Sequence, residues 1–138
     1  MNELLVWPML AQVALTAAVW VRLYVLRIAE MRRRRIDPQK VSLIGAKREL
    51  LEDTRGSDNF GNLFEVPVLF YAACLAAGMA GLESSLFVAL AWLFVMLRAI
   101  HSLIHTTYNR VMHRFSVHVA STVTAFLMWL VLAAELVA

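Results

Sequence analysis

The chain has 138 residues, of which 61% are hydrophobic and 17% are charged, and its formal net charge is +3. A soluble domain of this length cannot bury so much apolar surface, because small domains have a high ratio of surface to volume. The composition therefore excludes an ordinary soluble domain and predicts that a lipid bilayer surrounds the excess apolar surface.

Four apolar segments follow one another along the chain, each close to the roughly 20 residues that a helix needs to cross a bilayer. They show little strand-like alternation and contain much Leu and Ala, which favours helices over a barrel. The first segment has no basic region before it and no small-residue cleavage site after it, so we do not expect a cleaved signal peptide. We predict one all-α domain, 1–138, an integral membrane four-helix bundle with helices at about 4–26, 60–82, 86–107 and 115–137.

A long polar loop, about 28–59, joins the first two predicted helices. Its stretch from about Ser42 to Asp53 has a helical pattern, so we expect a short helix that lies at the membrane surface or leads into the second span. Gly56 and Ser57 favour a break after this helix, and Asn59 is typical of a helix N-cap.

The positive charges lie almost entirely in two of the connections. Ten of the 13 Lys and Arg residues fall within 22–55. The other three are Arg98, Arg110 and Arg114. Because Lys and Arg accumulate in cytoplasmic loops, we predict that the 1–2 and 3–4 connections are cytoplasmic and that both termini lie outside. The run MRRRRI, residues 31–36, is more typical of a juxtamembrane cluster near anionic lipid than of a nucleic-acid site, so no nucleic-acid partner is expected.

Polar residues recur at helical spacing in three of the predicted spans. Because residues three or four apart share a helix face, each set forms one polar stripe, the first of them if the second helix extends back as far as Arg55. In the predicted orientation all three stripes lie in the cytoplasmic halves of their helices. Such groups seldom face lipid, so we expect them to contact one another or a ligand. The stripes are Arg55, Asp58, Asn62 and Glu65; Arg98, His101, His105 and Tyr108; and Arg114, His118, Ser121 and Thr122.

One interpretation of the stripes is an internal network, in which Glu65 pairs with Arg98 or Arg22 and Asn62 ties two helices together. Another is a site for a small anionic ligand beside a lipophilic co-substrate at the edge of the bilayer. Arginine suits such a site, because it binds carboxylates bidentately and stabilises a nearby thiolate. The residues themselves leave both interpretations open.

The histidines also permit a metal or a haem. His101 and His105 are one turn apart, so both rings lie on one helix face, and Glu65 with His118 would complete a set of nitrogen and oxygen ligands. A haem held between His118 and one of the other two rings is a further alternative. The diiron pattern Glu-x-x-His is absent. This alternative stays open, and we assign no metal ligand.

Two short motifs carry a resemblance to a known family. The second span opens with Asn62-x-x-Glu65, and the third closes with Arg98-x-x-His101, followed one turn later by His105. A further arginine, Arg114, opens the fourth span. With four short spans and a long basic first loop, this combination resembles the MAPEG superfamily, the membrane-associated proteins in eicosanoid and glutathione metabolism.

The resemblance implies a homotrimer in a membrane, here a bacterial inner membrane, that binds glutathione between subunits near the cytoplasmic side. Glutathione would be the co-substrate of a transferase or peroxidase acting on a small lipophilic substrate. Arg114 would be the catalytic residue and would stabilise the thiolate. The glutathione-binding residues would be Arg55, Asn62, Glu65, Arg98, His101 and His105.

Two positions depart from the pattern of the glutathione-using members. Those proteins carry an arginine four residues before the Asn, where this chain has Asp58, and usually a tyrosine where it has His105. An added carboxylate weakens the binding of an anionic tripeptide. The alternative to an enzyme is therefore a structural or accessory membrane subunit, in which the polar residues form an intramembrane network.

Overall fold

The computed structural model describes residues 3–41, 50 and 55–137, so the helix expected at about 42–53 lies outside the described residues except for Leu50. Within these ranges there is no strand, and the predicted all-α fold is confirmed. The elements in chain order are η1 (Glu3–Leu5), α1 (Val6–Arg34), η2 (Pro38–Val41), α3 (Arg55–Asn62), α4 (Val66–Met79), α5 (Ser85–Thr106) and α6 (Val111–Val137).

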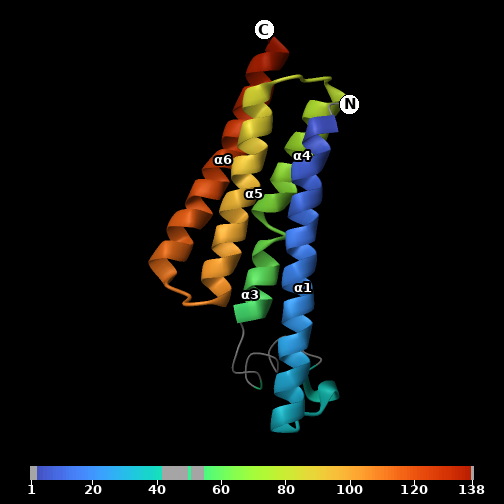
Figure 1. Cartoon of the computed structure of the whole chain (residues 1–138), viewed down its shortest axis with the longest axis vertical. Helices are drawn as coiled ribbons and strands as arrows, with labels where there is room; N and C mark the ends of the chain where they lie inside the picture. Colours follow the sequence, from blue (N-terminus) through green and yellow to red (C-terminus); the bar gives the residue numbers. More distant parts are fainter. Residues whose placement is uncertain (1–2, 42–49, 51–54, 138) are drawn as a thin grey trace.

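Four stretches of the described chain are long and apolar enough to cross a membrane: Glu3–Arg34, Arg55–Met79, Ser85–Thr106 and Val111–Val137. Many of their large apolar side chains are exposed, as expected where lipid is the solvent. The protein is thus an integral membrane four-helix bundle. Both termini and the α4–α5 connection lie at one end of the bundle, and the α5–α6 connection and the far end of α1 lie toward the other (Figure 1).

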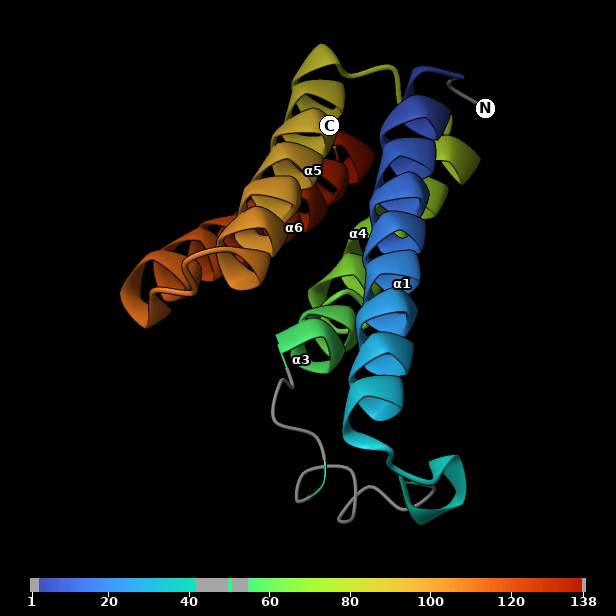
Figure 2. The ribbon, with the colours of Figure 1, turned by 60° about the horizontal axis from the view of Figure 1, so that its bottom comes forward.

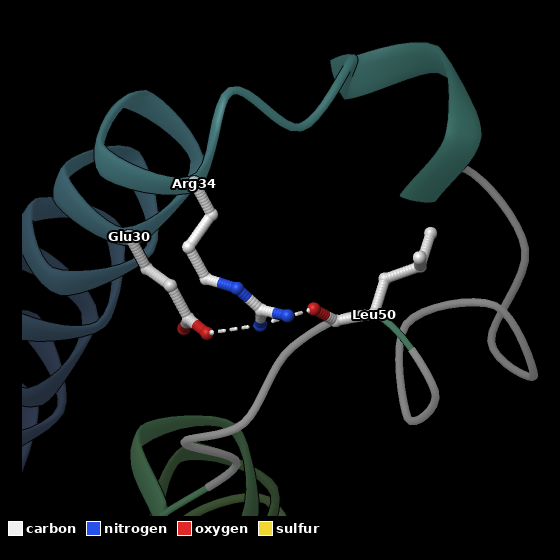
Figure 3. Close-up of polar contacts among 3 residues, drawn as sticks. All are labelled: Glu30, Arg34 and Leu50. Atoms are coloured by element: carbon white, nitrogen blue, oxygen red, sulfur yellow. Dashed lines mark hydrogen bonds and ion pairs between the residues drawn. The ribbon is translucent and has the colours of Figure 1, made fainter.

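The first helix continues past its expected end near Leu26 and stops at Arg34. The Arg34 guanidinium lies 3.2 Å from Oε1 of Glu30, one turn earlier, and such pairs stabilise a helix. The same group donates to the backbone carbonyl of Leu50 at 2.7 Å and so ties the first loop to α1 (Figure 3). Arg35 then ends the helix, because its φ of 51° is the left-handed conformation of a C-cap.

The second span differs from the continuous helix expected over about 60–82, because a turn at 63–65 separates α3 from α4. Pro67 explains the break: it has no N–H to donate, and in a continuous helix its ring would clash with the carbonyl of Leu63. The polar stripe expected along this span is therefore divided, and Glu65 lies outside α3, directly before α4.

The helix α3 spans Arg55–Asn62, so Gly56 and Ser57 lie within it and do not form the expected break. Gly56 is buried against α1, where an added Cβ atom would lie 3.2 Å from Cδ1 of Leu23. The missing side chain lets α1 and α3 approach closely. Asn59, which we expected as an N-cap, is a buried residue inside α3.

The apolar core lies between α4, α5 and α6. Phe70 and Phe94 stack at its centre with ring centroids 4.6 Å apart. Figure 2 shows α5 beside α6, and α1 beside α3. At the end of the bundle away from the chain termini, this packing brings α3 close to the C-terminal part of α5 and the N-terminal part of α6. The polar stripes meet there. Small residues that allow the close approach include Ala73, Ala77, Ala91 and Ala125.

Candidate functional site

Arg98 of α5 is completely buried, and its guanidinium joins three helices. Nη2 donates to the backbone carbonyl of Asn62 at the end of α3, and Nη1 lies 3.3 Å from Nδ1 of His118 on α6. Its Nε has no hydrogen-bond partner within the described chain. A buried cation is costly unless it is paired, so these contacts make Arg98 the centre of the polar layer.

The acceptor for Arg98 exists because the second span is broken. In a continuous helix the carbonyl of Asn62 would accept a hydrogen bond from the N–H of Val66. The turn before α4 removes that donor, and the guanidinium of Arg98 replaces it. The cation also lies at the negative end of the α3 dipole, where positive charge is favoured.

The three histidines of the predicted stripes form one cluster beside Arg98. The rings of His101 and His105 stack with centroids 5.9 Å apart, and those of His101 and His118 lie 5.6 Å apart. His101 and His105 are buried and their Nδ1 atoms have no partner in the described chain, whereas His118 is half-buried. His105 also interacts with the backbone of Arg55, so α5 lies close to α3 at this point.

The geometry gives no support to the metal alternative. Within residues 3–41, 50 and 55–137, no group of three or more His, Cys, Asp or Glu side chains is placed to hold a metal ion. Nδ1 of His118 instead lies 3.3 Å from Nη1 of Arg98, so a metal cation beside it would meet like charge.

The charged residues at the edge of the layer are more accessible than Arg98. Glu65 is exposed and interacts electrostatically with Arg98, but no ion pair joins the two side chains, which are both described. Arg114 is half-buried and donates from Nη1 to Oδ1 of Asn109 at 2.8 Å. It also interacts electrostatically with all three clustered histidines. A mobile anionic ligand would meet Arg114 before it met Arg98.

Two expected contacts are replaced by others. Arg22, considered as a partner of Glu65, donates instead to the backbone carbonyl of Thr106 at 3.1 Å, near the end of α5. Tyr108, expected on the α5 stripe, lies exposed beyond the helix and contacts His113, with ring centroids 5.8 Å apart. The layer therefore holds Asn62, Arg98 and the histidine cluster in contact, with Glu65, Arg55 and Arg114 at its margin.

Among the described residues, four buried polar residues were not part of the predicted stripes: Gln12, Asn59, Ser102 and Thr124. Asn59 accepts a hydrogen bond from Oγ of Ser102 at 3.2 Å, and its Nδ2 has no partner in the described chain. Gln12 of α1 is completely buried, and neither polar atom of its amide has a partner there. Ser102 directly follows His101, so the sequence indicates that it lies near the polar stripe of α5. Gln12 is a lone polar residue in an apolar segment, and no pattern in the sequence indicates a role for it.

Comparison with known families gives one result. The model of the MAPEG family matches residues 5–134, which is nearly the whole chain. Neither the curated proteins nor the solved structures give a significant match to this chain.

Proposed function

This chain belongs to the MAPEG family, and from that premise we propose that it is a glutathione-dependent transferase or peroxidase acting on lipophilic substrates. The enzyme is a homotrimer in a bacterial inner membrane. The α5–α6 connection and the first loop face the cytoplasm, and both termini face the other side. This orientation follows from the excess of Lys and Arg in and beside these two connections, because such residues accumulate on the cytoplasmic side.

The observation that carries this proposal is the convergence of Arg98, Glu65 and Arg114 around one polar layer from three different segments. Arg98 is fixed by the carbonyl of Asn62 and by His118, while Glu65 and Arg114 keep accessible charge. Glutathione carries two carboxylates, an amine and a thiol. Its thiolate suits the accessible guanidinium of Arg114, and its amine suits the exposed carboxylate of Glu65.

In the proposed reaction glutathione supplies a thiolate nucleophile, and the lipophilic electrophile reaches it from the bilayer. Arg114 stabilises the negative charge on sulfur, as a guanidinium beside a thiol does. Arg98, Asn62 and Glu65 hold the polar end of the tripeptide. His101 and His105 are buried within one subunit, where His101 lies near Arg98 and His105 near Arg55. They therefore hold these residues in place and do not contact glutathione directly. Arg55 is exposed at the start of α3.

The test is glutathione binding by calorimetry on detergent-purified protein. We expect binding in the micromolar-to-millimolar range that weakens at least about tenfold in Arg114→Ala, since a hydrogen bond to a charged group contributes ~1.5–3 kcal/mol. Arg110→Ala is the matched control, because Arg110 is an exposed arginine at the start of the same helix. Folded protein that releases no heat at millimolar glutathione would rule the proposal out.

A second candidate function has its own support in the contacts of Arg98. Both Nη atoms of this residue are used within one chain, which is what a purely structural network requires. As a non-enzymatic subunit, the protein would bind no glutathione, and Glu65→Gln would alter its assembly alone. Size-exclusion chromatography with light scattering, run beside the calorimetry, separates the two functions.

A further inference from the structure

One exposed face of α1 changes from aromatic to aliphatic to basic along its length. Trp20, Tyr24 and Ile28 are 48%, 43% and 43% exposed, and Arg32 and Arg35 are exposed beyond them. Spacings of four, four, four and three place all five on one side of the helix and its C-cap. The rings of Trp20 and Tyr24 contact each other with centroids 4.9 Å apart. We call these five residues the α1 stripe.

Three other arginines of this helix bond inside the subunit, whereas Arg33 is exposed and lies outside the α1 stripe. Arg22 donates to the carbonyl of Thr106, Arg27 donates to Oγ of Ser57, and Arg34 bonds to Glu30 and to the carbonyl of Leu50. The side chains of Arg32 and Arg35 make no hydrogen bond or ion pair within the described residues. Arg32 and Arg35 therefore have no side-chain partner among the described residues, and they share a face with three exposed apolar side chains.

The length of α1 places the two parts of the stripe at different depths of a bilayer. The helix has 29 residues, so at ~1.5 Å per residue it is about 43 Å long, whereas the hydrocarbon core is ~30 Å thick. If the core begins near Val6, it ends near Leu26. Arg32 and Arg35 then lie roughly 9–14 Å beyond the hydrocarbon, at the level of the headgroup phosphates and within about one Debye length of them. Trp20 and Tyr24 lie below that level, among the acyl chains.

We propose that the α1 stripe binds an acidic phospholipid. Its acyl chain lies along Trp20 and Tyr24, Ile28 contacts the region where the acyl chain joins the headgroup, and Arg32 and Arg35 bind the charged phosphate. Guanidinium groups suit this role because they bind phosphate oxygens bidentately, and their long apolar stems extend along the chain toward the interface. The inference does not depend on glutathione binding.

A second copy of the chain is a poorer occupant of this surface. Residues 22–55 contain ten Lys and Arg against five Asp and Glu, so a neighbouring copy would bring the same excess of positive charge to the same level. Like charges that face each other at an interface are unfavourable. An anionic lipid brings negative charge to the two arginines, and each basic residue near an anionic surface strengthens the attraction about fivefold.

The test uses quenching of Trp20 fluorescence by lipids with brominated acyl chains. Protein is placed in nanodiscs of phosphatidylcholine that contain a small share of brominated phosphatidylglycerol or, separately, of brominated phosphatidylcholine. The Trp20 signal is the difference between the natural chain and Trp20→Phe. We expect the acidic lipid to quench Trp20 at least about fivefold more efficiently than the neutral one at equal mole fraction, and high salt to reduce this preference.

The variant Arg32→Gln with Arg35→Gln should abolish the preference, so that both lipids quench Trp20 equally. The matched control is Arg33→Gln with Arg110→Gln, which removes the same charge from two exposed arginines outside the stripe and should keep the preference. Equal quenching by both lipids in the natural chain would overturn the proposal. So would the absence of quenching by either lipid, which would show that protein covers Trp20.

Discussion

Arg98 of α5 donates a hydrogen bond to the backbone carbonyl of Asn62, so a side chain of one helix closes the C-terminal end of another. The same guanidinium contacts His118 of α6. Three helices are therefore held by one residue that is completely buried. Because each partner is a single acceptor at a fixed position, both the charge and the forked shape of the arginine are needed.

Arg98→Lys should destabilise the protein although it keeps the positive charge. One ammonium group cannot satisfy the Asn62 carbonyl and His118 Nδ1 at the positions of the two Nη atoms. We expect the free energy of unfolding to fall by about 2 kcal/mol, measured by detergent denaturation followed by circular dichroism.

Arg110→Lys provides the reference for that measurement, because Arg110 is exposed and the change should stay within ~0.5 kcal/mol. Equal stabilities of the two variants would show that the contacts of Arg98 do not hold the helices.

Gly56 and Gly61, both in α3, should respond in opposite directions to alanine. A Cβ atom at Gly56 would lie 3.2 Å from Cδ1 of Leu23, whereas nothing lies within 4 Å of one at Gly61. We expect Gly56→Ala to lower the free energy of unfolding by ~1 kcal/mol through overpacking, and Gly61→Ala to raise it by ~0.5 kcal/mol through helix propensity. The same denaturation experiment measures both, and a destabilised Gly61→Ala variant would contradict the open space seen there.

The number and class of the spans could be predicted because they depend on length and hydropathy alone. The break at 63–65 does not follow from the helical spacing, although Pro67 lies within the predicted second span. A proline near a helix start is tolerated, so its presence does not by itself separate a start from an interruption. Whether Pro67 starts a new helix or interrupts a continuous one depends on how α3 packs against α1.

The polar layer could be predicted in outline and not in its pairings. Helical spacing predicted that Arg98 and the histidines lie at one depth of the bundle. It cannot predict which backbone carbonyls accept their hydrogen bonds. The acceptors of Arg98 and Arg22 include the carbonyls of Asn62 and Thr106, which no side-chain pattern indicates. The roles proposed for Arg114 and the glutathione-binding residues stay predictions.

Ser102→Ala should test the contact between α3 and α5. Oγ of Ser102 donates to Oδ1 of Asn59 at 3.2 Å in a buried setting, and its removal leaves the Asn59 amide without that donor. We expect a loss of about 1 kcal/mol in the free energy of unfolding, measured by detergent denaturation. Ser116→Ala is the control, because Ser116 is exposed and bonds within its own helix. A loss in both variants alike would point to serine replacement in general and not to the interhelical bond.

Asp58→Arg should strengthen glutathione binding, because it replaces an exposed carboxylate at the start of α3 by the cation that the glutathione-using relatives carry. The change turns a repulsive charge near an anionic tripeptide into an attractive one. At ~4 Å each unit of charge contributes ~1 kcal/mol even in water, so we expect affinity to rise at least about tenfold in calorimetry.

Asp58→Asn should give a smaller part of that gain. Asp37→Arg makes the same change of charge on an exposed residue of the first loop and should leave the affinity nearly unaltered. An affinity that rises equally in Asp37→Arg would attribute the effect to net charge, and one that does not rise in Asp58→Arg would place the tripeptide away from α3.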